Sequence, residues 1–87
     1  QVVLLGYYDA LPGSEFEACA DAMALLEERY QLIATNRDTV HYLDMGDFIT
    51  PDDESGYDPD RVHPSAKGSE AVGRGIGALI NELSSNP

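Results

Sequence analysis

The chain has 87 residues, 43% of them hydrophobic, and a formal net charge of −11. This length fits one small domain, and the hydrophobic content argues against intrinsic disorder. Five basic residues against 16 acidic ones weigh against nucleic acid and anionic membranes as partners, because so few cations cannot neutralise many phosphates. No apolar run approaches the roughly 20 residues that cross a bilayer, so we expect no membrane span.

A run of aliphatic residues from Val2 to Leu5 predicts the first strand. The run is unbroken rather than alternating, which is typical of a strand covered on both faces in a parallel sheet. It is too short for a signal peptide and lacks a basic flank. Asp9 follows the strand at the edge where the clefts of open α/β sheets lie. It is therefore a candidate site residue, although an aspartate before a turn commonly serves the turn alone.

The next segment has the pattern of an amphipathic helix. Apolar residues recur every three or four positions from Phe16 onward, which predicts a helix over about residues 15–34. Ser14 and Glu17 have the spacing of a capping box, in which each side chain accepts the backbone amide of the other residue. Asn36 tolerates left-handed geometry and is expected to end the helix.

Cys19 is the only cysteine, so no disulfide can form within the chain. It lies on the predicted apolar stripe together with Met23, and we expect both side chains to be buried in the core. A thiol in such surroundings would be inert. Pairing with a cysteine of another polypeptide is the alternative.

The segment from Thr39 to Asp44 is rich in β-branched and aromatic residues and predicts a second strand. His41 lies in its middle and is expected to be a partly buried packing residue. Asp44 and Asp47 flank the end of this strand. Since the carboxyl ends of parallel strands meet at one edge of a sheet, we expect both to line the same cleft as Asp9.

Residues 46–62 form a long acidic segment whose prolines and glycine exclude a helix or a central strand. The acidic residues suggest calcium binding, but the spacing does not fit. With Gly56 at the sixth position of an EF-hand loop, the first position is Pro51, which has no ligand atom in its side chain. We therefore expect no metal and no cofactor.

The segment after this loop has the residues of a general base. Asp60 precedes His63 by three residues, so it can fold back in one turn and hydrogen-bond one imidazole nitrogen. The other nitrogen is then free to take a proton from a nucleophile.

A final helix is predicted over residues 65–83, with Pro64 in its first turn. Four glycines lie within it, each costing up to about 1 kcal/mol relative to alanine, and close packing of the helix backbone against a sheet would offset that cost. The helix macrodipole disfavours a protonated His63, whereas the Asp60 carboxylate favours it. We expect these opposing effects to hold the imidazole as a neutral base.

The predicted order is a βαβα unit, and a right-handed crossover makes its two strands parallel. Two parallel strands alone leave both sheet edges exposed, so neighbouring strands are expected. The fold class is therefore α/β. We expect residues 1–87 to be the C-terminal portion of a single, larger three-layer α/β domain.

The sequence Asp60-Arg61-Val62-His63-Pro64 before a final amphipathic helix, with two strands upstream, resembles the C-terminal part of an SGNH (GDSL-type) hydrolase. The resemblance covers nearly the whole chain in element order, but only Asp60, His63 and Pro64 are specific to it. It implies a flavodoxin-like α/β/α fold with a parallel sheet, and a serine esterase or lipase acting on an ester substrate. It further implies that His63 is the general base and that Asp60 orients it.

The nucleophile motif of that family, Gly-Asp-Ser-Leu, is absent, as is its Gly-x-Asn-Asp block, so the serine and the oxyanion-hole residues cannot be assigned here. Ser14, Ser55, Ser65 and Ser69 lack the sequence context of other known serine nucleophiles. The resemblance therefore implies that an N-terminal half, in a second chain or in further residues, supplies the serine. This chain alone is expected to be inactive. Secretion is compatible with the family, and no residue here indicates a compartment.

A second class of protein fits the same pattern. An acidic α/β interaction module without catalytic activity would use His63 only to cap the last helix. Such a module would complete its sheet by forming a dimer or by binding a partner.

Overall fold

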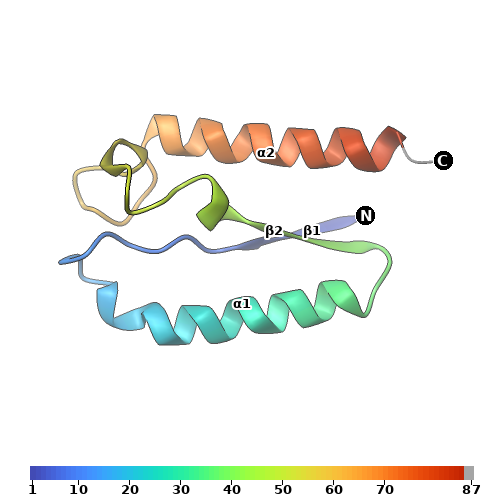
Figure 1. The fold of residues 1–87 in the computed structure, drawn as a ribbon, viewed down its shortest axis with the longest axis horizontal. Helices are drawn as coiled ribbons and strands as arrows, with labels where there is room; N and C mark the ends of the chain where they lie inside the picture. The colour runs from blue at the N-terminus through green and yellow to red at the C-terminus, as the bar shows by residue number, and fades with distance from the viewer. Residues whose placement is uncertain (86–87) are drawn as a thin grey trace.

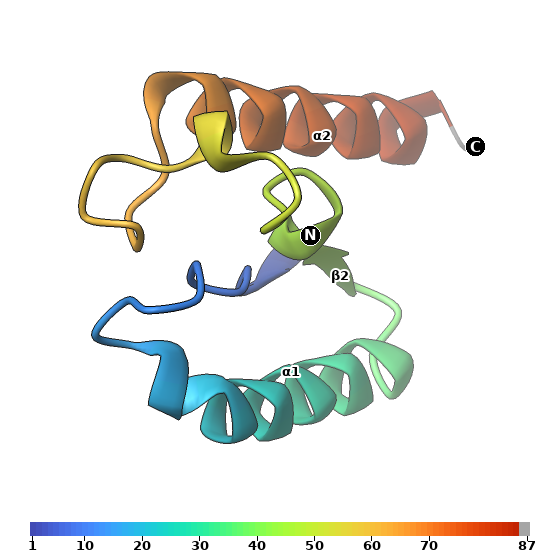
Figure 2. The ribbon, with the colours of Figure 1, turned by 60° about the vertical axis from the view of Figure 1, so that its left-hand side comes forward.

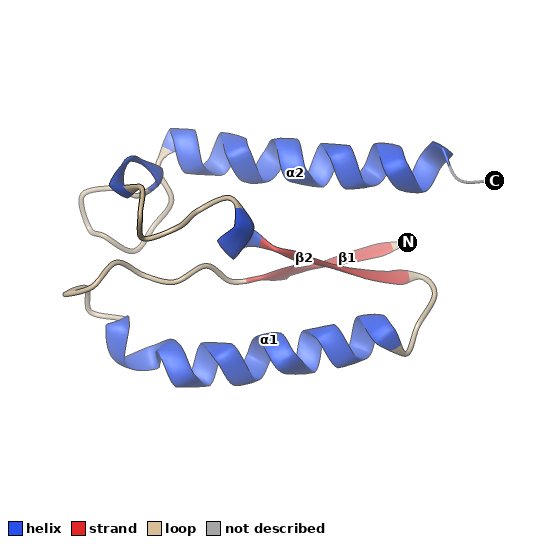
Figure 3. Cartoon of the chain, viewed as in Figure 1, coloured by secondary structure: helices blue, strands red, loops and turns tan. Residues whose placement is uncertain are grey.

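In the computed structural model, which describes residues 1–85, two helices lie on opposite sides of a two-stranded sheet (Figure 1). The same arrangement is visible after a rotation of 60° (Figure 2). In chain order the strands and α-helices are β1 (Val2–Gly6), α1 (Ala20–Thr35), β2 (Val40–Asp44) and α2 (Ala66–Ser85). Three short 3₁₀ helices lie in the connections (Figure 3), namely η1 (Glu17–Cys19), η2 (Met45–Asp47) and η3 (Glu54–Gly56).

The two strands are parallel, with register pairs running from Val2 opposite Val40 to Gly6 opposite Asp44. The α/β class, the parallel sheet and the βαβα order that the sequence predicted are therefore confirmed. All five residues of β2 are half-buried.

The start of α1 differs from the prediction. The side chain of Glu17 accepts the backbone amide of Gly13, at 2.8 Å, and not that of Ser14. The hydroxyl of Ser14 is buried without a hydrogen-bond partner in the described part of the chain. The predicted capping box is therefore wrong, since the Glu17 carboxylate is occupied one residue upstream. The chain makes the 3₁₀ turn η1 first, and α1 begins at Ala20 rather than at residue 15.

The end of α1 is close to the prediction. Thr35 is its last residue, and the backbone amide of Asn36 donates to the carbonyl oxygen of Leu32 at 3.2 Å. Asn36 has a φ of −92°, so the helix ends there without the left-handed residue that we expected.

The face that α1 turns to the sheet is narrower than predicted. No residue of α1 is fully buried. Its half-buried positions follow one another at spacings of four, three and four residues: Met23, Glu27, Tyr30 and Ala34. Leu26 and Ile33 are each 39% exposed. Cys19 is also exposed, so its predicted burial is wrong. Two strands are too narrow to cover the whole apolar face of a helix of this length.

The buried core lies beyond the carboxyl ends of the strands. Ile49 is 2% exposed, and it packs with four other buried residues from the loops and from α2: Tyr8, Leu11, Tyr57 and Val72. The connections of the molecule are therefore better buried than its strands. This places the most rigid part of the structure next to the Asp60–His63 segment.

The sequence predicted that glycines of α2 pack closely against a sheet, but the two that make close approaches contact residues of the connection between β2 and α2. A Cβ atom on Gly68 would lie 2.3 Å from the carbonyl oxygen of Gly56, and one on Gly75 would lie 2.4 Å from the ring of Phe48. Gly73, by contrast, has no such neighbour within 4 Å. Close backbone packing therefore explains some of these glycines and not others. Among the described residues, no helix combines the length and the hydropathy needed to cross a membrane.

The contrast between these glycines predicts opposite effects of alanine. Gly68→Ala should lower the free energy of unfolding by about 1–3 kcal/mol, because the new methyl group meets a backbone oxygen that cannot move aside. Gly73→Ala should raise it by up to about 1 kcal/mol through helix propensity alone. Urea unfolding followed by circular dichroism measures both. Equal effects of the two substitutions would contradict the packing of α2 on η3.

Candidate functional site

Residues 57–64 form a tight hairpin that carries the acid–histidine pair. The amide of Asp58 donates to the carbonyl oxygen of His63 at 2.8 Å, and the amide of Arg61 donates to the carbonyl oxygen of Asp58 at 2.9 Å. Tyr57 and Pro64 face each other in an antiparallel bridge at its base. Arg61 has a φ of +65°, a left-handed conformation that completes the turn.

The predicted contact between Asp60 and His63 is present. One carboxylate oxygen of Asp60 (Oδ2) is hydrogen-bonded to Nδ1 of the His63 ring. The other oxygen (Oδ1) accepts the backbone amides of Val62 at 2.9 Å and His63 at 3.0 Å. The carboxylate therefore fixes both the ring and the backbone of the turn. Nε2 of His63 does not take part in this contact, and the His63 side chain is 68% exposed.

These contacts shift the pKa values of both groups in opposite directions. The hydrogen bond from His63, with those from the two backbone amides, lowers the pKa of Asp60 to about 2. The same carboxylate raises the pKa of His63 above its ordinary value, mainly through the hydrogen bond and then through charge. The pKa of His63 thus shifts upward, in the direction that the carboxylate favours. Two residues separate His63 from the first residue of α2, and the macrodipole acts only near the helix end.

The hairpin is held from the segment that follows β1. The buried hydroxyl of Tyr8 donates to the carbonyl oxygen of Val62 at 2.8 Å. The amide of Leu11 donates to the carbonyl oxygen of Arg61 at 3.0 Å, and the Arg61 guanidinium donates to the carbonyl oxygen of Pro12 at 2.9 Å. Three hydrogen bonds with one segment therefore fix Arg61 and Val62, the two residues that precede His63.

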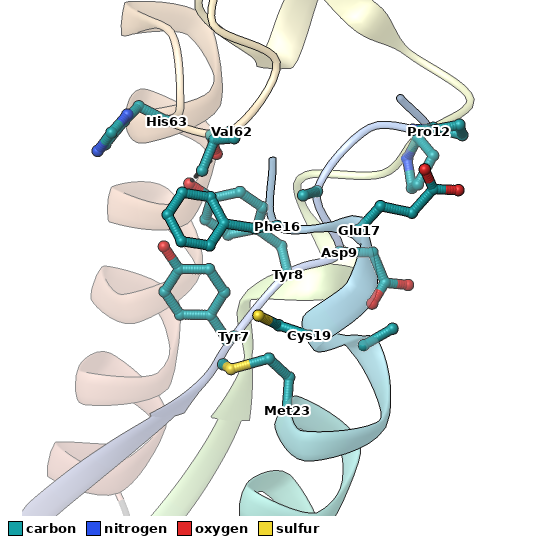
Figure 4. Close-up of a pocket in the computed structure, with 13 residues that line it drawn as sticks. Tyr7, Tyr8, Asp9, Pro12, Phe16, Glu17, Cys19, Met23, Val62 and His63 are labelled. Atoms are coloured by element: carbon teal, nitrogen blue, oxygen red, sulfur yellow. Dashed lines mark hydrogen bonds between the residues drawn. The ribbon is translucent and has the colours of Figure 1, made fainter. Parts of the chain in front are cut away.

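A pocket of about 660 Å³ lies between this hairpin, the segment after β1 and the start of α1 (Figure 4). His63 and Asp9 both line it, as does Cys19. Most of the other lining side chains are apolar or aromatic, including Tyr7, Tyr8, Phe16, Met23 and Val62. The volume is within the range of small-molecule sites in proteins.

Sequence reasoning placed Asp9 at a cleft but missed both His63 as its neighbour and the aromatic lining. Tyr7 and Phe16 are 41% and 51% exposed, respectively. A sequence signal existed in Tyr7, since it lies at the carboxyl end of a predicted parallel strand, where ligands of open α/β sheets bind. No such signal existed for Cys19 and Met23, which the helical period assigned to the core.

Asp44 and Asp47 do not join this pocket, so the prediction that they share a cleft with Asp9 is wrong. Asp44 instead accepts the amide of Gly46 at 2.8 Å and caps η2. That 3₁₀ turn leads the chain away from the sheet edge. His41 is half-buried, as predicted, and its Nε2 lies 2.6 Å from the side-chain oxygen of Gln1.

The start of α2 is capped by Ser65 and not by His63. The hydroxyl of Ser65 accepts the amide of Gly68 at 3.2 Å. Pro64 precedes this cap, so it lies before the helix and not in its first turn as predicted. Its position in the bridge with Tyr57 explains the difference, because the hairpin continues to residue 64. The His63 ring is therefore not used to begin the helix.

Comparisons of this chain with models of protein families, with curated protein sequences and with solved structures find no match. The chemistry of the Asp60–His63 pair and of the adjacent pocket is therefore the basis for assigning a function.

The shifted pKa values fix the pH range in which the pair stabilises the folded chain. Because the folded-state pKa of Asp60 is lowered, its contribution is present above the pKa of an unfolded aspartate and is lost as pH falls towards about 2. Because the pKa of His63 is raised, its contribution is present below the pKa of an unfolded histidine and is lost as pH rises through the folded-state value. The pair therefore stabilises most in mildly acidic solution.

Replacing Asp60 should lower the pKa of His63. In the Asp60→Asn variant the imidazolium loses its charged partner, so the pKa of His63 should fall clearly below its value in the unmodified chain. Asp58→Asn removes the same charge, but Asp58 is the weakest of the causes that raise this pKa, so its effect should be small. NMR titration of the His63 ring protons measures both. Equal shifts in the two variants would exclude a specific Asp60–His63 contact.

The left-handed conformation of Arg61 predicts a difference between two of its variants. Both Arg61→Ala and Arg61→Gly lose the bond to the Pro12 carbonyl oxygen, but only glycine adopts a positive φ without steric cost. Arg61→Gly should therefore have a free energy of unfolding about 1 kcal/mol above that of Arg61→Ala. Denaturant unfolding of the two proteins side by side tests this, and equal midpoints would be evidence against the turn geometry.

Proposed function

We propose that this chain supplies the general base of a serine ester hydrolase of the SGNH type. The observation that carries this is the Asp60–His63 pair, held on a rigid hairpin at the rim of an apolar pocket. A histidine fixed through Nδ1 by a carboxylate, with Nε2 outside that contact, is the arrangement that activates a hydroxyl nucleophile. The pocket provides room for an ester next to the ring.

In this mechanism Nε2 of His63 takes the proton of a serine hydroxyl while the serine oxygen attacks the ester carbonyl carbon. The tetrahedral intermediate collapses, and the imidazolium gives the proton to the departing alcohol oxygen. Water then attacks the acyl-serine, with His63 again accepting and returning a proton, and the carboxylic acid leaves. Asp60 stabilises the transient imidazolium, which agrees with the direction in which it shifts the His63 pKa.

The serine nucleophile comes from polypeptide outside these 87 residues. Among the serines of the described chain, Ser55 donates to Asp53 and accepts from Lys67. The Ser65 hydroxyl is occupied by Ser55 and by the first turn of α2. Neither hydroxyl is hydrogen-bonded to the His63 ring in residues 1–85. The complete enzyme would also contain the oxyanion-hole donors, which have no candidate here.

The exposed apolar surface supports a larger domain. Val2 of β1 is 50% exposed, and Leu26 and Ile33 of α1 are each 39% exposed. Further strands next to the two-stranded sheet would cover such side chains, giving the three-layer, flavodoxin-like fold of this type of hydrolase. On this basis the chain is the C-terminal portion of one domain.

The same exposed surface is the observation that favours a second function. An acidic α/β module without catalytic activity would bury the apolar flank of α1 and the free strand edges against a partner or a second copy. Sedimentation equilibrium and intact-mass analysis of the purified protein separate the two functions. A stable homodimer of 9.4 kDa chains, purified from the natural source with paired strand edges and no polypeptide that supplies a serine half, would support the module and contradict the enzyme.

In the complete protein, His63→Ala should lower the turnover of a model ester such as p-nitrophenyl acetate by at least about 100-fold, because the serine loses its base. His41→Ala is the matched control, since His41 lies outside the pocket and contacts Gln1. It should retain near-normal turnover. Circular dichroism verifies that both variants are folded. Retained activity in folded His63→Ala would exclude His63 as the base.

The pH dependence of turnover should follow the His63 ring. The ring accepts a proton only when neutral, so turnover should rise as pH increases through the raised pKa of His63. In Asp60→Asn the midpoint of this rise should move to lower pH, because the carboxylate that raises the pKa is gone. A midpoint that does not move would show that another group controls the reaction.

A further inference from the structure

The pocket beside His63 has an unequal distribution of charge. Among the described residues that line it, two are acidic and none is lysine or arginine. In Figure 4 the carboxylates of Asp9 and Glu17 lie on the side opposite the His63 ring, while the rings of Tyr7 and Phe16 lie on the side of His63. A molecule that fills the pocket therefore meets aromatic rings on one side and negative charge on the other.

Asp9 is the carboxylate that remains available to a ligand. Its backbone carbonyl oxygen accepts the hydroxyl of Tyr57, but its side chain has no hydrogen bond or ion pair with any residue of the described chain. Glu17 is partly occupied by the amide of Gly13. Arg61 is bonded to the carbonyl oxygen of Pro12 and does not line the pocket, so it does not neutralise Asp9 there.

Two of the aromatic side chains that line the pocket are partly exposed, Tyr7 by 41% and Phe16 by 51%. The rings of Tyr7 and Tyr8 stack with a centroid distance of 4.7 Å and an interplanar angle of 14°. The faces of tyrosine and phenylalanine rings attract ammonium groups, most strongly when the cation is partly removed from water. The described residues contain no group of three or more side chains suited to hold a metal ion. The matching ligand is therefore an organic cation rather than a metal.

We propose that this pocket binds an organic cation with an apolar body, such as a quaternary ammonium group carrying an alkyl chain. Asp9 supplies the opposite charge, Tyr7 and Phe16 supply ring faces, and Met23 contacts the alkyl part. The identification of this ligand with the substrate rests on the proposed function. In that case the hydrolase prefers esters that carry an ammonium group in the part of the molecule that enters the pocket.

Cys19 allows ligand binding in the pocket to be measured without an assay of enzyme activity. It is the only cysteine of the chain, it is exposed, and it lines the pocket. A bound ligand should therefore slow its alkylation by iodoacetamide, which mass analysis of this chain follows over time. Octyltrimethylammonium is the cationic probe. 1-Octanol and octanoate, with the same number of chain carbons but neutral and negative head groups, are the comparison probes.

The cationic probe should slow the alkylation of Cys19 at concentrations where 1-octanol and octanoate have little effect. Asp9→Asn should raise the concentration of octyltrimethylammonium needed for half-protection by about fivefold, as expected for the loss of one partly exposed ion pair. Asp21→Asn removes the same charge from the first turn of α1, outside the pocket, and should leave this concentration unchanged.

Other results of the protection experiment would reject the cation site, and one result would reject the hydrolase function while keeping the site. Equal protection by 1-octanol, stronger protection by octanoate, or no protection by any probe would overturn the site. An equal increase in the half-protection concentration in Asp9→Asn and Asp21→Asn would also overturn the site, because the effect would then depend only on the net charge of the chain. Selective protection in the complete protein, if that protein has no esterase activity, would establish the site and reject the hydrolase function.

Discussion

The hydrogen bonds of the Asp60 carboxylate are the interaction on which the rest of this structure depends. One oxygen bonds the His63 ring and the other accepts two backbone amides of the same turn. A carboxylate used in this way determines the orientation of the imidazole and the path of the chain together. The low pKa of Asp60, about 2, follows from these same bonds. The His63 ring is thus positioned by hydrogen bonds within its own turn.

Tertiary contacts then place this local unit beside a pocket. The hydroxyl of Tyr8 reaches the Val62 carbonyl oxygen, and the hydroxyl of Tyr57 reaches the Asp9 carbonyl oxygen. Both tyrosines are buried in the core that joins the loops to α2. The most buried part of the molecule therefore supports the hairpin rather than the sheet. This distribution is typical of a fold in which strands carry a site and the loops after them are made rigid.

The surface of the chain is apolar where a small acidic protein is expected to be polar. Leu25 and Leu32 are more than half exposed on the outer side of α1, in addition to the side chains next to the sheet. With a net charge of −11, two copies of this chain repel each other unless apolar contacts compensate.

The sequence by itself determined the elements and the local chemistry. The βαβα order, the parallel strands, the end of α1 near Asn36 and the contact between Asp60 and His63 all follow from residue types at short spacing. The elements and the Asp60–His63 contact could be predicted because each depends on hydrogen bonds or side-chain periods within a few residues, whereas the parallel pairing followed from the handedness of a βαβ connection.

Only the tertiary structure decided which faces are buried and which residues meet. The helical period placed Cys19 on an apolar stripe, but the chain forms η1 there, before α1 begins, and Cys19 is exposed and lines a pocket with His63. Asp44 was drawn into capping η2, so it never reached the cleft that Asp9 lines. These outcomes depend on contacts between segments far apart in the chain, which the spacing of residues along the sequence does not specify.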